Sequence, residues 1–317
     1  MSYRSAKARR RLPPLLAIGL FALVASGCSL PLQSSRIDEW PAARQAVELT
    51  EVPFHPQERY QCGPAALATL LNHSGVKVSP ATLRDQVYLP DREGSLQVEI
   101  LAATRRHGRI PYRLRPELVD LLRELQAGRP VLVLQNLALA WAPRWHYAVV
   151  VGYLPEERTV VLRSGTRRRH RVPIDLFERT WRRGGYWGLV VLRPGELPAT
   201  AEERRYLESV VPLERLRRWE AVEQAYQAAL ERWPESLVAL MGLGNSRYAR
   251  GDLAGAMRAF RRAVEAHPGS AAAHNNLAHL LAEQGDLPAA LAHARRAVAL
   301  SDDPRYRNTL AEIETRR

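Results

Sequence analysis

The stretch QERYQCGPAALATLLNHSG, residues 57–75, contains one of the two cysteines of this 317-residue chain. Proline suits the first turn of a helix, where its missing N–H would have no partner anyway, so Pro64 predicts a helix that begins near Cys62. The alanines and leucines that follow make this helix apolar, and Gly75 predicts where it ends. We therefore expect Cys62 at the N-terminus of a buried helix.

A cysteine in this position can act as a nucleophile. The positive end of a helix dipole favours the thiolate over the thiol. Gln57 lies shortly before Cys62 in the sequence. Its side-chain amide can donate a hydrogen bond to the oxygen that becomes negative when a thiolate attacks a carbonyl. The stretch thus predicts a nucleophile and an oxyanion donor.

A thiolate nucleophile needs a base, and the chain has nine histidines. His146 opens a pair of apolar β-strand segments, HYAVVVGYLPEERTVVLRSG at residues 146–165. A histidine at the start of a buried strand is held rigidly and can meet a cysteine that is distant in sequence. Taken alone, a buried histidine beside valine-rich strands is more often structural. Its combination with Cys62 and Gln57 favours a catalytic role.

Four segments together resemble the bacteriocin-processing cysteine peptidases, papain-like enzymes that cleave after double-glycine leaders. They are Gln57 with CGPAALA at 62–68, EGSLQVEILAATRRHG at 93–108, PVLVLQNL at 130–137 and HYAVVVGY at 146–153. The resemblance implies an α+β fold in which a helix carrying the nucleophile Cys62 packs against an antiparallel sheet carrying the general base and acid His146. It also implies Gln57 as the oxyanion donor.

The sequence departs from this family at the residue that orients the histidine. The family has an aspartate at the end of the second strand, and the matching position here is Ser164. A serine can bond to an imidazole nitrogen but gives no charge support to the imidazolium. Asn136 and Asp175 are the other candidates for this role. The family's enzymes are also usually fused to a membrane transporter, whereas here a repeat array and an expected lipid anchor accompany the peptidase segment. The resemblance therefore does not imply a double-glycine leader as the substrate.

Residues 1–27 have the pattern of an export signal, a basic segment followed by an apolar one. The segment ASGC, which ends at Cys28, resembles a bacterial lipobox, although Ala25 stands where leucine is favoured. The resemblance implies lipidation of Cys28. Because Ser29 rather than an aspartate follows, it also implies an outer-membrane lipoprotein that faces the periplasm. An ordinary secreted protein is the alternative.

The C-terminal part is rich in alanine, leucine and arginine, and it repeats every 34 residues: RGDLAGAMRAFRRAV begins at Arg250 and QGDLPAALAHARRAV at Gln284. This period resembles tetratricopeptide (TPR) repeats, in which alanines let two helices approach and an aromatic residue fills the gap between them. The resemblance implies an all-α domain that ends in a capping helix. A generic helical bundle is the alternative.

The expected organisation is a signal peptide at 1–27, a tether at 28–50, a papain-like cysteine peptidase domain at 51–195 and a TPR domain at 200–317. The formal net charge of +13 can indicate a nucleic acid or an anionic surface as partner. We expect no nucleic acid partner, because no basic run is interleaved with aromatic side chains that could stack on bases. The densest basic patch, residues 167–171, is interpreted as a solvated loop or as a site for an anionic partner.

These patterns predict a lipid-anchored periplasmic cysteine peptidase whose TPR repeats recruit a peptide or protein substrate, or a protein partner. We expect no cofactor, and no metal, because no cluster of His, Cys, Asp or Glu has the spacing of a ligand set. Two alternatives stay open. One is a catalytically inactive scaffold, suggested by the missing acidic partner of His146. The other is a peptidyl or acyl transferase that uses the same thioester chemistry.

Overall fold

The computed structural model of the protein describes residues 31–56 and 61–316. The expected signal peptide, the lipidation site Cys28 and the oxyanion donor Gln57 lie outside these residues. Within the described residues, no helix is both long enough and apolar enough to cross a membrane.

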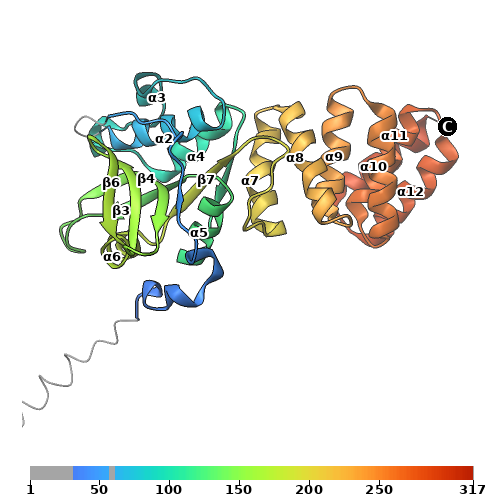
Figure 1. The fold of residues 1–317 in the computed structure, drawn as a ribbon. Coiled ribbons are helices and arrows are strands. Elements are labelled where there is room, and N and C mark those ends of the chain that lie inside the picture. The colour runs from blue at the N-terminus through green and yellow to red at the C-terminus, as the bar shows by residue number, and fades with distance from the viewer. Residues whose placement is uncertain (1–30, 57–60, 317) are drawn as a thin grey trace, which may run out of the picture.

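The first domain contains a sheet with helices on both sides (Figure 1). Its strands are β1 (Val47–Glu48), β2 (Ile110–Arg113), β3 (Val131–Asn136), β4 (Trp145–Leu154), β5 (Thr159–Ser164), β6 (Arg167–Pro173) and β7 (Gly188–Leu192). Its α-helices are α2 (Cys62–His73), α3 (Pro80–Val87), α4 (Gln97–Arg106), α5 (Leu118–Gln126) and α6 (Ile174–Arg183). Three short 3₁₀ helices are η1 (Gln33–Glu39), η2 (Pro41–Ala43) and η3 (Pro90–Arg92).

The strands form one antiparallel sheet in the order β2-β7-β3-β4-β5-β6, and β1 pairs with β4. Successive residues of β4 point to opposite faces. Tyr147 and Val149 lie in the core under α2, α3 and α4, whereas Ala148 and Val150 lie in the core that includes α5 and α6 (Figure 1). Because both faces are covered, β3 and β4 are apolar at nearly every position, which explains their continuous hydrophobic sequences.

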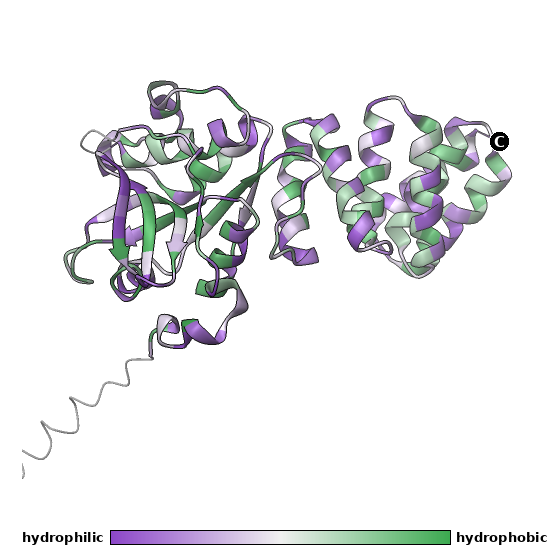
Figure 2. Cartoon of the chain, in the orientation of Figure 1, coloured by the Kyte–Doolittle hydropathy of each residue, from purple (hydrophilic) through white to green (hydrophobic). Residues whose placement is uncertain are grey.

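The arginine-rich patch 167–171, interpreted from sequence as a loop, belongs to the edge strand β6, which is hydrophilic beside its apolar neighbours (Figure 2). Arg169 forms an ion pair with Glu48 at 2.6 Å, and Arg171 forms one with Glu157 at 3.0 Å. Charged side chains along an exposed edge oppose pairing with a further strand. The sequence-based interpretation missed the strand because charged residues are rare in strands with two covered faces.

The segment expected to form a tether, residues 28–50, packs on the first domain wherever it is described. Ile37 is fully buried in the core. The backbone N–H groups of Gln33 and Ser34 each donate to the Glu178 carboxylate at 2.7 Å. The peptidase domain therefore extends back to about Gln33. The polar composition of the segment concealed this, because its attachment uses backbone donors and a few scattered apolar side chains, Ile37 with Trp40, Val47 and Leu49.

The second domain is entirely helical, and three antiparallel helix pairs are followed by one more helix. Its helices are α7 (Glu203–Arg215), α8 (Trp219–Arg232), α9 (Leu237–Ala249), α10 (Leu253–Ala266), α11 (Ala271–Glu283), α12 (Leu287–Leu300) and α13 (Pro304–Thr315). A Cβ atom added to Gly244 would lie 2.3 Å from the Phe260 ring, so the glycine admits the aromatic residue as the repeat pattern predicts. The repeat architecture is confirmed, with α13 in the position of the cap.

The two domains share one apolar core. Tyr206 and Val210 of α7 pack in the same cluster as Ile110 of β2. Beside this cluster, the fully buried Glu124 carboxylate accepts hydrogen bonds from the N–H and the hydroxyl of Thr200, at 2.8 and 2.7 Å. The proline-containing connection between the domains is thus a packed joint.

Candidate active site

Cys62 is the first residue of α2, as the sequence predicts. Its thiol lies against β4, where the backbone N–H of Tyr147 donates a hydrogen bond to it. The nucleophile candidate is therefore beside the residue that directly follows His146. The helix N-terminus was expected to favour the thiolate, but burial raises the pKa of the Cys62 thiol, and hydrogen bonds from Tyr147, Gly63 and Cys62 itself offset only part of this.

His146 is the second residue of β4, and its ring meets the end of β5. The Nε2 atom of His146 and the Oγ atom of Ser164 are 2.8 Å apart, within hydrogen-bonding distance. Antiparallel pairing of β4 with β5 brings the two residues together. The position that matches the family's aspartate thus contacts the imidazole.

The two other candidates for this role are engaged elsewhere. The Oδ1 atom of Asn136 accepts hydrogen bonds from the backbone N–H groups of Ala138 and Arg144, both at 3.0 Å. Asp175 is exposed and lies 3.8 Å from Arg158. Asn136 shapes the loop before β4, and Asp175 belongs to the surface of α6.

The surroundings of His146 favour the neutral imidazole. Burial lowers the pKa of His146 to about 4, and the positive charge of Arg144, with that of His170 when it is protonated, acts in the same direction. Among the described residues, no acidic side chain raises the pKa of His146 to oppose this shift. These shifts favour a thiol at Cys62 and a neutral imidazole at His146, and neither group is a cause of the other's pKa shift.

A contact between α2 and the segment before α4 was not recognised from sequence. A Cβ atom added to Gly63 would lie 2.2 Å from the Oγ atom of Ser95. That Oγ atom is buried and has no hydrogen-bond partner among the described residues. The Tyr147 hydroxyl donates to the Ser95 carbonyl at 3.3 Å. The small residues in CGP and EGS were the available signal, because small residues permit such close approach.

Arg163 is a second residue that sequence reasoning missed. It is almost fully buried, and its guanidinium donates to the carbonyls of Thr50 at 3.1 Å, Val52 at 3.2 Å and Arg168 at 2.6 Å. Carbonyl oxygens replace the hydration that burial removes from this cation. Arg163 thereby connects the end of β5 to the segment that precedes Gln57 in the sequence.

Exposed apolar side chains adjoin the site in two segments. Trp141 and Trp145, 83% and 54% exposed, lie in and just after the loop that leads to His146, together with Leu137 and Leu139. Leu96 and Val98, 38% and 60% exposed, follow Ser95. Among the described residues of the first domain, the remaining large apolar side chain with comparable exposure is Leu176. Six of the seven exposed large apolar side chains described in this domain thus lie in the segments that lead to His146 or follow Ser95.

Comparison with known sequences agrees with this structure. Residues 49–188 match the model of the Peptidase_C39-like family, and residues 213–271 and 242–304 match that of a tetratricopeptide repeat. An uncharacterized protein of Methanothermobacter marburgensis is 30% identical over 129 residues, which make up 41% of this chain and 82% of that protein.

Two peptidase structures are among the solved structures to which this chain is similar. A C39-like peptidase from Bacillus anthracis is 18% identical, with a TM-score of 0.40, over 47% of this chain and 98% of its own. The peptidase domain of Streptococcus ComA, a bifunctional ABC transporter, is 19% identical, with a TM-score of 0.38, over 45% of this chain and 98% of its own. Through its first domain the chain belongs to the Peptidase_C39-like family, and tetratricopeptide repeats follow that domain.

Proposed function

We propose that this protein is a lipid-anchored cysteine peptidase of the periplasm, with Cys62 as nucleophile and His146 as general base and acid. The observation that carries the proposal is the position of the Cys62 thiol, at the N-terminus of α2 and against the Tyr147 N–H, one residue beyond His146. The Ser164 hydroxyl lies at the Nε2 atom of His146, so the proposal assigns proton transfer with the thiol to Nδ1.

The proposed reaction begins when the thiol proton passes to His146 and the Cys62 sulfur attacks a peptide carbonyl carbon. The backbone N–H of Cys62 and the side-chain amide of Gln57 stabilise the resulting oxyanion. The imidazolium then protonates the leaving amine as the C–N bond breaks, which leaves a thioester. His146 removes a proton from water, and the water attacks the thioester to release a carboxylate and restore the thiol.

The raised pKa of Cys62 and the lowered pKa of His146 bear on the timing of the first step. A thiol and a neutral imidazole are the favoured resting forms of the two groups. Proton transfer is therefore expected to accompany attack on the substrate, and a stable thiolate–imidazolium pair is not expected in the free enzyme. Above about pH 4, most His146 is in the basic form that this step needs.

The exposed side chains near the site suggest the class of substrate. Trp141 and Trp145 precede His146, while Leu96 and Val98 follow Ser95, which packs against the helix of Cys62. Large apolar side chains exposed together usually mark a binding surface. We propose polypeptides with large apolar side chains close to the cleaved bond as the substrates.

The test is cleavage of a peptide library prepared from a bacterial proteome, by the full-length protein in detergent. We expect new peptide termini from the wild type, with apolar residues near the cut, and none from Cys62→Ser. His146→Gln should lower the yield strongly at unchanged protein fold. Absence of any Cys62-dependent product would overturn the peptidase proposal. Products that carry an added amine in place of a free carboxylate would change it to a transferase.

A second candidate function is a scaffold that keeps the peptidase fold without cleavage. Two observations favour it: His146 meets a serine where the family has an acid, and the pKa shifts disfavour the ion pair. The test compares cells that carry Cys62→Ser with cells that lack the protein. A wild-type phenotype at equal protein level would support the scaffold, and the phenotype of the deletion would support catalysis.

The proposed location depends on Cys28 and is tested separately. Lipidation should label the wild-type protein with radioactive palmitate, and Cys28→Ser should abolish both the label and co-sedimentation with outer membranes. Labelled protein in inner-membrane fractions would contradict the outer-membrane proposal, and unlabelled wild-type protein would contradict the anchor.

A further inference from the structure

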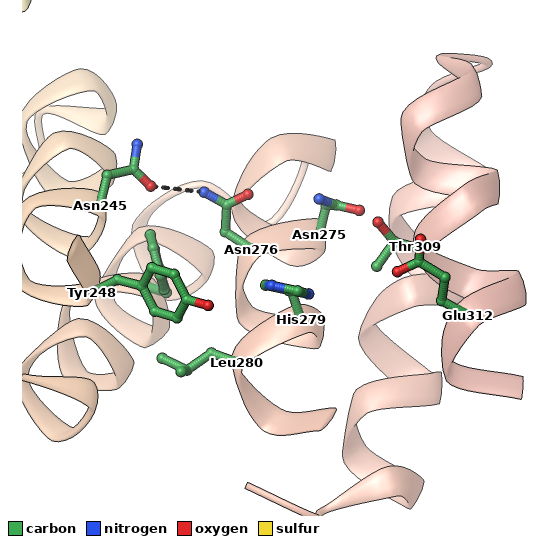
Figure 3. Close-up of a pocket in the computed structure, with 9 residues that line it drawn as sticks. Asn245, Tyr248, Asn275, Asn276, His279, Leu280, Thr309 and Glu312 are labelled. Carbon is green, nitrogen blue, oxygen red and sulfur yellow. Dashed lines mark hydrogen bonds between the residues drawn. The ribbon is translucent and has the colours of Figure 1, made fainter. Parts of the chain in front are cut away.

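A cavity of about 350 Å³ lies in the TPR domain, where α9, α11 and α13 face one another (Figure 3). Helices α9 and α11 are the first helices of successive repeats, and α13 is the cap. The residues that line the cavity are mostly polar: Asn245, Tyr248, Phe260, Asn275, Asn276, His279, Leu280, Thr309 and Glu312. Its volume is in the range of ligand pockets, about 300–1,000 Å³.

Three asparagine side chains provide the hydrogen-bonding groups along one side of the cavity. Asn276 donates from Nδ2 to the Oδ1 atom of Asn245 at 3.1 Å (Figure 3), and this bond does not use the Oδ1 atom of Asn276 or the Nδ2 atom of Asn245. The Oδ1 atom of Asn275 is buried and has no partner among the described residues. A side-chain amide offers one acceptor and two donors, which matches the C=O and N–H groups of a peptide backbone.

The charge of the cavity is negative, although the whole chain is basic. Glu312 extends from α13 toward the cavity, and it forms no ion pair with another described residue (Figure 3). Glu283 lies beside the cavity, where it accepts from the Tyr248 hydroxyl at 2.6 Å and lies 3.4 Å from the Nε2 atom of His279. None of the nine lining residues is a lysine or an arginine.

The arginines on the neighbouring turn of α9 do not cancel this charge, because two acidic residues, Glu223 and Asp252, already pair with them. Arg247 and Arg250 each lie 3.1 Å from the Glu223 carboxylate of α8. The Glu312 carboxylate therefore remains available to a cation from outside the chain.

We propose that this cavity binds an extended polypeptide segment that carries a lysine or arginine side chain. The segment's backbone would bond to Asn275 and Asn276, and its cation would pair with Glu312. This inference makes specific the recruiting role that the sequence predicts for the TPR repeats. It does not depend on the chemistry of Cys62, so the two proposals can fail separately.

The experiment measures binding of full-length protein in detergent to short fluorescein-labelled peptides of serine and alanine, with Arg, Lys, Gln or Glu at one central position. We expect Arg and Lys peptides to bind about threefold or more tightly than the Gln peptide, and the Glu peptide to bind most weakly. Glu312→Gln should remove the preference for Arg over Gln. Asn276→Ala should weaken binding of the Arg and Gln peptides by the same factor.

Glu314→Gln is the matched control, because Glu314 lies on the same helix, is half-exposed and faces Arg295 at 3.6 Å outside the cavity. It should keep the full preference for Arg. The proposal is overturned if Glu312→Gln retains that preference, if Glu314→Gln removes it equally, or if the Glu peptide binds best. Cys62→Ser should bind like the wild type, so a loss of cleavage alone leaves this result unchanged.

Discussion

The His146 imidazole has a hydroxyl group, and not a carboxylate, next to its Nε2 atom. A hydroxyl can hold the ring in position, but it adds no negative charge to stabilise the imidazolium. Burial, the Arg144 cation and His170 when it is protonated therefore lower the pKa of His146 without opposition from an acid. The low pKa of His146 thus reflects burial, the nearby positive charge and the absence of an acid beside the ring.

Substitution of Ser164 tests its role in positioning the ring. Ser164→Ala removes the bond to Nε2, and we expect kcat to fall about fivefold to tenfold, the usual value of one hydrogen bond. Ser164→Asp should raise the pKa of His146, because a carboxylate favours the charged ring, and should move the acidic limb of the kcat–pH profile upward. The measurement is the pH dependence of kcat on a peptide found in the library. An unchanged profile in both variants would show that Ser164 does not act on His146.

The lowered pKa of His146 also predicts how stability depends on pH. In the unfolded chain the pKa is about 6.5, and in the folded protein it is about 4, so the unfolded state binds the proton more readily between these values. The contribution to stability is complete above about pH 6.5 and is lost as the pH falls toward 4. When the pH is lowered from about 7.5 to about 5, His146 should decrease the free energy of unfolding by about 2 kcal/mol.

Urea unfolding of wild type and His146→Gln at both pH values measures this loss. Other histidines whose pKa values are lowered, such as His55 and His170, contribute to both proteins and cancel in the comparison. Between the two pH values, the free energy of unfolding of the variant should fall by about 2 kcal/mol less than that of the wild type. An equal loss in both proteins would contradict a buried neutral His146.

At the scale of elements, the packing of α2 on the segment before α4 depends on Gly63. Gly63→Ala would place a methyl group 2.2 Å from the Ser95 hydroxyl oxygen, so either α2 or this segment must shift. We expect a destabilisation of about 1–3 kcal/mol and a loss of activity, because α2 carries Cys62 at its first turn. Thermal unfolding and library cleavage measure the two effects.

Gly94→Ala is the control for this change, because its Cβ atom would meet its nearest neighbour at an ordinary 3.5 Å. It should be close to neutral. The double substitution Gly63→Ala with Ser95→Gly removes the clash and should recover part of both stability and activity. Failure of the second change to recover either would place the cost of Gly63→Ala elsewhere.

At the scale of the whole molecule, the shared core predicts that the two domains unfold together. Glu124→Ala would leave the Thr200 donors and the Arg129 guanidinium, 3.4 Å from that carboxylate, without their partner in a buried joint. We expect the free energy of unfolding to fall by about 3 kcal/mol, and the single unfolding transition to separate into two. Tryptophan fluorescence and far-ultraviolet circular dichroism, followed during urea unfolding, should coincide for the wild type and diverge for the variant. Glu156→Ala, at an exposed position, should behave like the wild type.

The main elements were accessible from local patterns. Pro64 and Gly75 delimit α2 closely, and the apolar run after His146 is strand β4. The repeated glycines and alanines with Phe260 identify the TPR helices, because each repeat packs mainly on its neighbours. The family resemblance pointed to Ser164, because it stands at the end of the second strand where the family has an aspartate. The structure places its hydroxyl at the imidazole.

Contacts between distant segments were not accessible in this way. Nothing local in Arg163 reveals that its guanidinium binds the carbonyls of residues 50 and 52. Nothing in the polar segment near Gln33 reveals that its backbone binds Glu178. Such contacts involve backbone atoms, which every residue possesses and which therefore leave no pattern in the sequence.

The sequence by itself determined the helix that begins at Cys62, the strand that begins at His146, the repeat period and the order of the two domains. Each depends on short-range periodicity, on turn and cap residues, or on self-similarity along the chain. Only the tertiary structure decided the partner of His146, the attachment of residues 33–48 and the protonation states of the two reactive side chains. Protonation depends on burial and on charges brought from several elements, so a helix N-terminus that favours a thiolate in isolation is outweighed by the desolvation of Cys62 in the folded protein.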